Sequence, residues 1–264
     1  MKPYTHFLIT RFNLKNAKSH WQKTKTGDRV LSEKWLQNRF KIFNSYCLPS
    51  ILNQSEKNFN WLLYFDIDTS DFYKNQIQEL ANEYPFIKPI YSEEYQSFLK
   101  NISKDVLSNI DKVSTHIITT RLDNDDALHF QAIETIQSFF KNQDLAVFNF
   151  TKGFCLQTLP FQVLTKYDYP KGPFMSMIEK IPSDKKVRTI ITSKHGSLEN
   201  IQQIDDKRYW IQIIHDQNLS NEALGVPTKN VSVLEDFGLK NLDASYSFKN
   251  LLKFYTQRIW KKLG

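Results

Sequence analysis

An apolar segment that ends in a cluster of acids lies near the middle of the chain: His116-Ile117-Ile118-Thr119-Thr120-Arg121-Leu122-Asp123-Asn124-Asp125-Asp126. Its first half is rich in Ile and Thr, which is typical of a buried strand. Three carboxylates and an Asn follow directly after that strand. In open α/β sheets, ligands bind at the carboxyl ends of the strands. The stretch therefore predicts a ligand site at the end of a central strand.

The crowded carboxylates have two explanations. Acidic groups this close repel one another unless a cation or strong hydrogen bonds hold them. A hard divalent ion, Mn²⁺ or Mg²⁺, that shares its oxygen ligands with a substrate phosphate would relieve the repulsion. The alternative is a solvated loop or helix cap, with Asp123 or Asp125 capping a helix from Ala127 to Phe140. A calcium loop of the EF-hand type is disfavoured, because Leu128 stands where that loop needs Gly.

Composition indicates one large α/β domain with a sizeable core. The chain has 264 residues, of which 41% are hydrophobic and 14% aromatic. We expect a cytoplasmic protein, since no apolar run nears the roughly 18 residues of a membrane span and no signal peptide is visible. The two cysteines, Cys47 and Cys155, agree with a reducing compartment. The net charge of +7 favours an anionic small substrate or lipid. Nucleic acid is not expected as a partner, because no nucleic-acid-binding module is recognisable.

Strands and helices alternate over the first 126 residues, which predicts a parallel sheet built from βαβ units. The expected strands are 6–13, an apolar run within 59–69, 86–91 and the run from His116. The expected helices are 31–51, ended by Pro49, then 72–84 and 92–111. The polar segment 15–30 is expected to be a loop that closes over a ligand.

The second half has a different rhythm, which predicts a mixed sheet. A helix is expected over 127–142, followed by two strands within 145–158 that are joined near Lys152-Gly153. A later strand over 209–214 ends in His215, and the tail from Phe248 to Leu263 has the pattern of a basic amphipathic helix.

Four motifs, taken in order, resemble a known family. They are Ile9-Thr10-Arg11-Phe12-Asn13, then Phe59-Asn60-Trp61-Leu62 with Phe65-Asp66, then Arg121 to Ala127, and finally Trp210-Ile211-Gln212 with His215 and Asn218. Over roughly residues 7–221 the chain is similar to the rhamnosyltransferase family of bacterial glycosyltransferases. The resemblance implies a GT-A (Rossmann-like) mixed α/β sheet with helices on both faces. It implies one domain over 1–245, with a nucleotide-binding half (1–126) and an acceptor half (127–245), followed by the helical tail 246–264.

The resemblance also implies an activity, the transfer of a hexosyl or deoxyhexosyl group from a nucleotide-diphosphate sugar. The acceptor would be a glycan or a lipid-linked glycan, in the synthesis of surface polysaccharide. Asp123-Asn124-Asp125 stands at the position of the DXD motif, so Asp125, Asp123 and His215 become the predicted ligands of Mn²⁺ or Mg²⁺. The residues predicted to bind the nucleotide sugar are Thr10, Arg11, Asp66, Arg121, Asp123, Asn124 and Asn218.

A general base must remove the proton of the acceptor hydroxyl if the transfer inverts the configuration. Glu179 follows the apolar run 174–178, a setting that would raise its pKa toward neutrality. It is the predicted base, although a glutamate in this pattern can also be an ordinary surface residue. His195 is the second candidate.

Two other functions stay open on the residues alone. Asp66-Ile67-Asp68-Thr69 is similar to the motif of haloacid-dehalogenase-type phosphatases, but a strand precedes it and the Gly-Thr expected after Asp68 is Thr69-Ser70. A carbohydrate-binding protein with a degenerate transferase fold is the other alternative. For the basic tail, peripheral contact with the inner leaflet of the membrane and packing against the domain are both open.

Overall fold

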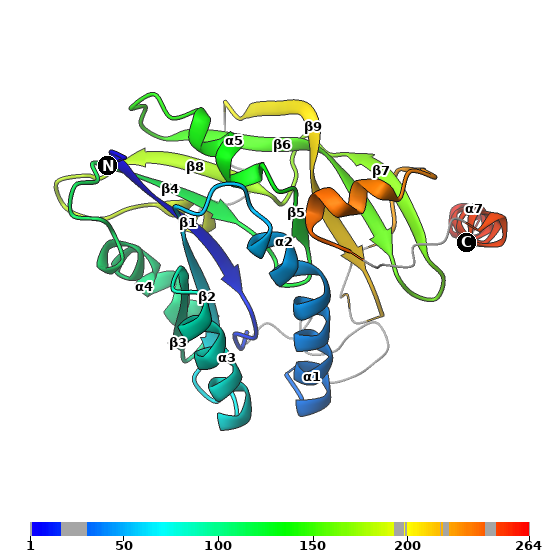
Figure 1. Cartoon of the computed structure of the whole chain (residues 1–264), viewed down its shortest axis with the longest axis horizontal. Helices are drawn as coiled ribbons and strands as arrows, with labels where there is room; N and C mark the ends of the chain where they lie inside the picture. The colour runs from blue at the N-terminus through cyan, green and yellow to red at the C-terminus, as the bar shows by residue number, and fades with distance from the viewer. Residues whose placement is uncertain are drawn as a thin grey trace.

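The structure is a computed structural model that describes residues 2–16, 31–192, 198, 200–216, 218, 222–240 and 247–263. A large twisted sheet runs through the molecule, with helices packed against it (Figure 1). The strand order is β10-β7-β6-β8-β4-β1-β2-β3, and β9 pairs with both β6 and β5. The strands are β1 (Tyr4–Arg11), β2 (Asn60–Asp66), β3 (Ile87–Ser92), β4 (His116–Arg121), β5 (Ala127–Leu128), β6 (Ala146–Gln157), β7 (Val163–Asp168), β8 (Met175–Lys180), β9 (Gln202–Ile214) and β10 (Val226–Pro227).

The first four strands form the predicted parallel half. β1 pairs in parallel with both β2 and β4, and β2 pairs in parallel with β3. β8 then adds to β4 in the antiparallel direction, and β6 adds antiparallel to β8. The sheet is therefore mixed, as the change of rhythm after residue 126 predicted.

Side-chain alternation along β1 and β2 explains why helices cover both faces. Leu8 and Trp61 join the core under α1 and α3, whereas Phe7, Leu62 and Tyr64 join the core under α4. The helical segments are α1 (Glu33–Ile42), the π-helical η2 (Phe43–Cys47), α2 (Leu48–Leu52), α3 (Asp71–Glu83), α4 (Tyr95–Ser108), α5 (Ala132–Ser138), α6 (Thr189–Thr192), the 3₁₀ helix η4 (Ser232–Phe237) and α7 (Phe248–Leu263). The predicted fold class is confirmed.

Pro49 does not end the helix that was expected over 31–51. The chain widens into a π-helical turn, in which the Leu48 N–H donates to the Phe43 carbonyl, and then continues to Leu52. Pro49 thus stands in the first turn of α2, where a missing N–H is tolerated.

The helix expected over 127–142 is shorter than predicted. Ala127 and Leu128 are fully buried and pair with Ile211 and Trp210 of β9, so tertiary pairing overrides the local helical pattern. α5 starts at Ala132, with Gln131 at its N-cap position. Asp123 and Asp125 therefore do not cap this helix, and the cap explanation of the acidic cluster is wrong.

A further correction concerns residues 145–158, where β6 is one continuous strand and not two. The hairpin turn lies later, between β6 and β7. Gly153 is instead the point where the Trp210 ring of β9 contacts the backbone: a Cβ added at Gly153 would lie 2.1 Å from Trp210 Cδ2.

α7 has the predicted bounds and packs on the domain through part of its surface. Phe254 is 2% exposed and lies with Phe161 and Val163, while Arg258 donates to the Gly225 carbonyl at 2.9 Å. Among the helices that the structure describes, α7 included, none has both the length and the apolar composition of a bilayer-crossing segment.

Candidate functional site

The carboxyl ends of the parallel strands bring the predicted site together. β1 ends at Arg11, β2 at Asp66 and β4 at Arg121, and the parallel pairing places these ends at one edge of the sheet. The acidic cluster follows β4 directly. The pairing of β5 with β9 then brings the end of β9 to the cluster, since Ala127 pairs with Ile211 and the Ile213 N–H donates to Asp126 Oδ1 at 2.9 Å.

Asp125 is the centre of a buried polar network. Its Oδ2 accepts from Arg39 Nη1 at 2.6 Å and from Asn218 Nδ2 at 3.3 Å, and it lies 3.1 Å from His215 Nε2. The Asn218 side chain also fixes His215, because its Oδ1 accepts from the His215 backbone N–H at 2.6 Å. Residues 90 positions apart in sequence thus meet at one carboxylate.

The pKa values of the neighbouring Asp125 and Asp126 carboxyl groups shift in opposite directions. Burial alone would raise the pKa of Asp125, but the Arg39 guanidinium and the His215 contact outweigh burial and hold that pKa below its ordinary value. For Asp126, burial and repulsion from Asp125 and Asp123 raise the pKa well above the ordinary value. Asp125 is therefore the stronger acid of the pair, and Asp126, whose Oδ1 accepts from the backbone of β9, is the weaker one.

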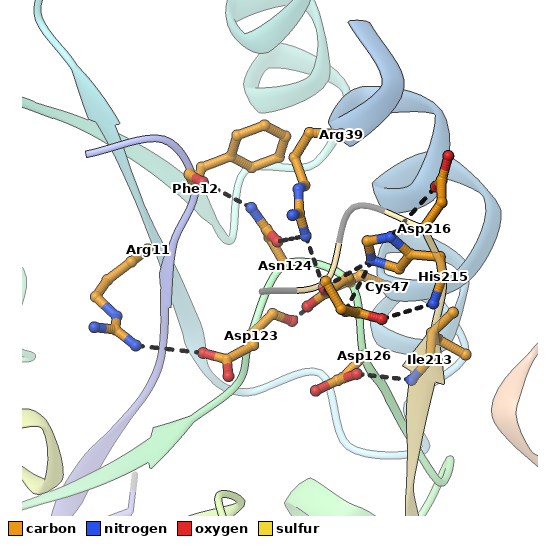
Figure 2. Close-up of polar contacts among 12 residues, drawn as sticks. Arg11, Phe12, Arg39, Cys47, Asp123, Asn124, Asp126, Ile213, His215 and Asp216 are labelled. Atoms are coloured by element: carbon orange, nitrogen blue, oxygen red, sulfur yellow. Dashed lines mark hydrogen bonds and ion pairs between the residues drawn. The ribbon is translucent and has the colours of Figure 1, made fainter. Parts of the chain in front are cut away.

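Asp123 faces two arginines and is more exposed than Asp125. Its Oδ1 lies 3.5 Å from Arg11 Nη2 and 3.5 Å from Arg121 Nη2, and Arg11 also lies over the Tyr95 ring at 5.4 Å. Asn124 points the other way: its Nδ2 donates to the Phe12 carbonyl at 2.8 Å, and its Oδ1 accepts from Arg39 at 3.2 Å (Figure 2). The edge therefore carries fixed positive charge next to its carboxylates.

Asp66 is held at the same edge by the residues that follow β1. Its Oδ2 accepts from the Lys15 backbone N–H at 3.2 Å, and Lys15 Nζ lies 3.2 Å from Oδ1. Asn13 accepts from the Asp66 N–H at 3.1 Å and donates to Thr69 Oγ1 at 3.0 Å. Because Asp66 is 3% exposed and bonded in this way, it lacks the open carboxylate that a phosphatase nucleophile needs.

The donor set at Asp125 fits a hard divalent ion. Neighbouring ligands of an octahedral ion, at about 2.1 Å from the metal, lie about 3 Å apart, which matches the 3.1 Å between Asp125 Oδ2 and His215 Nε2. Asn218 Nδ2 lies 3.1 Å from the same nitrogen, and an imidazole nitrogen is a common ligand of divalent transition metals. Within the described parts of the chain, no group of three or more His, Cys, Asp or Glu side chains converges.

Two predicted residues are placed elsewhere. Thr10 is fully buried and its Oγ1 accepts from Trp61 Nε1 at 3.0 Å, so the side chain has no exposed atom for a nucleotide. Glu179 pairs with Ile117, roughly 13 Å before the end of β4 at about 3.3 Å per residue. Burial does raise the pKa of Glu179, but its carboxylate accepts the Arg188 and Thr189 backbone N–H groups at the start of α6. The structure therefore gives Glu179 a structural role, and His195 lies outside the described residues.

Sequence reasoning missed Arg39, which comes from α1 and is 8% exposed. The signal was present, because Arg39 follows Trp35 by four residues and Leu36 by three, on the apolar stripe of the helix. A charged residue on such a stripe needs a buried partner. Here the partner is Asp125.

A family model described as "Putative rhamnosyl transferase" matches residues 5–226 of the chain. The chain belongs to this family of glycosyltransferases, which confirms the family predicted from its motifs. Among solved structures it is similar to S. aureus TarS 1–349, with 13% identity and a TM-score of 0.44 over 79% of this chain and 60% of that one. The complex of TarS 1–349 with UDP-GlcNAc gives 12% identity and a TM-score of 0.48 over 97% of this chain and 72% of that chain. No curated protein was found to match the chain.

Proposed function

We propose that the protein transfers a hexosyl or deoxyhexosyl group from a nucleotide-diphosphate sugar to a glycan or lipid-linked acceptor, with Mn²⁺ or Mg²⁺ at Asp125 and His215. The observation that carries the proposal is the 3.1 Å approach of these two side chains at the carboxyl edge of the sheet, in a chain of a glycosyltransferase family. Transfer of this kind serves the assembly of a surface polysaccharide. The haloacid-dehalogenase alternative loses its basis, because Asp66 is buried and bonded.

Each residue at the edge has a task in this proposal. A divalent ion supplies Lewis-acid stabilisation to the departing nucleoside diphosphate. Arg11 and Arg121 each lie 3.5 Å from Asp123 and offer planar donors to phosphate oxygens. Asp123 is suited to a ribose hydroxyl or a water on the ion, and Asn218 holds His215 in position. Asp66 fixes Lys15 beside the nucleotide. His195 stays the predicted base.

The first test names the nucleotide and the metal together. UDP, GDP and dTDP are each added with Mn²⁺, with Mg²⁺ and with EDTA, and the thermal unfolding midpoint is measured. We expect one nucleotide to stabilise the protein by about 2.7 kcal/mol at 100 times its Kd. For a domain of this size that is a rise in Tm of roughly 5 to 10 °C. The rise should largely disappear in EDTA.

The same experiment can contradict the proposal in two ways. A nucleotide that stabilises equally in EDTA and in Mn²⁺ excludes the metal but keeps the donor. Absence of any shift with all three nucleotides, together with no release of nucleotide from the matching sugar donors, excludes the transferase.

α7 supplies a second part of the proposal, contact with an anionic membrane surface from the cytoplasmic side. Phe248, Leu252 and Tyr255 are 76%, 57% and 47% exposed and recur at helical spacing, on a face that the domain does not cover. Lys249 lies beside them in the sequence. A helix with an exposed apolar stripe and basic neighbours binds in the interface of anionic bilayers.

We expect the variant with Phe248→Ser, Leu252→Ser and Tyr255→Ser to lose vesicle binding. Each buried aromatic or aliphatic side chain contributes about 1.5 to 3 kcal/mol, so the partition coefficient should fall tenfold or more. Flotation with vesicles of phosphatidylglycerol and phosphatidylcholine measures it. Phe72→Ser on α3 is the matched control, since Phe72 is 63% exposed and far from α7 in sequence. Equal flotation of the triple variant and the wild type would remove the membrane contact.

A further inference from the structure

Arg39 is a buried cation placed on the proposed metal ligand. Its side chain is 9% exposed, and its guanidinium lies over the Trp35 ring at 4.9 Å. Nη1 donates both to Asp125 Oδ2 and to Asn124 Oδ1. A buried charge costs several kcal/mol unless it is paired, so Arg39 and Asp125 stabilise each other in the ligand-free protein. The carboxylate that would bind the ion already has a counter-charge.

A free divalent ion must therefore compete with Arg39. Oδ2 of Asp125 is contacted by Arg39, His215 and Asn218 at once. An ion that binds Asp125 and His215 would lie within a few ångströms of the guanidinium, and like charges at such distances repel. Metal binding alone should consequently be weak in this chain.

A nucleoside diphosphate changes this balance, because it brings its own negative charge to the guanidinium. Arginine donates well to phosphate oxygens in its plane. Arg39 Nε is buried and has no hydrogen-bond partner among the described residues, so the guanidinium is not fully paired in the ligand-free protein. The guanidinium can keep a counter-charge when the ion takes Asp125.

We propose, on the basis of the proposed function, that the Arg39 guanidinium keeps free metal from the Asp125 carboxylate. When a nucleoside diphosphate binds, the guanidinium pairs with the diphosphate and no longer with Asp125, so that metal and nucleotide bind together. Arg39 is thus a binding residue of the donor site and the origin of a coupling between two ligands. By linkage, the factor by which nucleotide strengthens Mn²⁺ binding equals the factor by which Mn²⁺ strengthens nucleotide binding.

The test measures the dissociation constant of Mn²⁺ from the electron paramagnetic resonance signal of the free aqueous ion. The titration is made with and without the nucleotide that stabilises the protein. A titration of that nucleotide without protein corrects for the Mn²⁺ that the nucleotide itself binds. In the wild type we expect the nucleotide to tighten Mn²⁺ binding roughly ten- to hundredfold. In Arg39→Gln, Mn²⁺ alone should bind tighter than in the wild type, and the tightening by nucleotide should shrink correspondingly. Arg39→Lys keeps the charge and should keep most of the coupling.

Arg208→Gln is the matched control. Arg208 also pairs with an aspartate at 2.6 Å, Asp168, and also lies over an aromatic ring, that of Phe154 at 5.4 Å. This change should leave Mn²⁺ binding unaltered with and without nucleotide.

Three outcomes would overturn the inference. Wild-type protein that binds Mn²⁺ equally well with and without nucleotide has no coupling to explain, and this result needs no variant to fold. Coupling that persists in a folded Arg39→Gln leaves the proposed function intact but removes the role of Arg39. Absence of Mn²⁺ binding in every protein and condition would end both the metal site and the inference.

Discussion

Asp125→Asn should abolish sugar transfer while leaving the fold in place. The change removes the charged oxygen on which the proposed ion depends, and metal stabilisation of a leaving phosphate contributes several kcal/mol. A loss of about 4 kcal/mol corresponds to a fall in kcat of about 10³-fold. Steady-state transfer from the nucleotide sugar in Mn²⁺, with release of nucleotide as the readout, measures this.

Loss of stability must be separated from loss of chemistry in this variant. Asp125→Asn leaves the Arg39 guanidinium buried without its counter-charge, and breaking a buried pair costs about 3 to 5 kcal/mol. Thermal unfolding therefore accompanies the kinetics, with assays run well below the unfolding midpoint. Partial recovery of activity is not expected at any Mn²⁺ concentration.

Asp126→Asn is the matched control at the next position. Burial and its acidic neighbours raise the pKa of Asp126 well above its ordinary value, which favours the neutral form of the side chain relative to a free carboxyl group. Asparagine reproduces a neutral group of the same shape and can accept the Ile213 N–H through its carbonyl oxygen. We expect this variant to keep activity within a few-fold of the wild type.

Two results at Asp125 would contradict the transferase. If folded Asp125→Asn transfers sugar at the wild-type rate, no ion acts through this carboxylate. If the wild type binds nucleotide sugar but transfers nothing to any acceptor, and Asp125→Asn binds equally well, the protein is a carbohydrate-binding module on a transferase fold.

The first half of the fold was predictable because its signals are local. Each of the first four strands is a short apolar run, and the segments between them have helical spacing, so that the parallel direction of the strands follows from the rules for βαβ connections. Their carboxyl ends then had to share one edge. This is why Arg11, Asp66 and the acidic cluster could be placed together from the sequence.

The sequence-based predictions fail where a residue far away in the sequence determines the local structure. Ala127 and Leu128 are drawn into pairing with β9, whose register no local pattern shows. Thr10 lies near the end of β1, where a ligand residue is expected, but its hydroxyl oxygen accepts a hydrogen bond from Trp61. Glu179 has the expected raised pKa, yet β8 runs antiparallel and places it toward the other end of β4. Arg39 differs from these, since its place on an apolar stripe was visible in the sequence.

Gly153→Ala should destabilise the fold strongly, although it adds one methyl group. The Cβ would lie 2.1 Å from Trp210 Cδ2 and 2.3 Å from Trp210 Cε2, distances that no real contact allows. The ring cannot simply turn away, because Trp210 is 1% exposed, its Nε1 donates to the Phe150 carbonyl at 2.8 Å, and it stacks on Phe174. Overpacking typically costs about 1 to 3 kcal/mol, and we expect the upper end.

Chemical denaturation at neutral pH measures the loss, and a fall of roughly 3 kcal/mol would lower Tm by about 6 to 12 °C in a chain of this size. Lys152→Ala is the control at the adjacent position, where the side chain is half-buried and donates to the Asp205 carbonyl. In the double variant with Trp210→Val the ring is gone, so adding the Gly153→Ala methyl should cost far less than in the wild type. If Gly153 were needed only for a turn, as the sequence pattern suggested, the added methyl group would lower the stability by the same amount with or without the Trp210 ring.

Because β6 and β9 also carry His215 to Asp125, a folded Gly153→Ala should in addition bind Mn²⁺ and nucleotide more weakly.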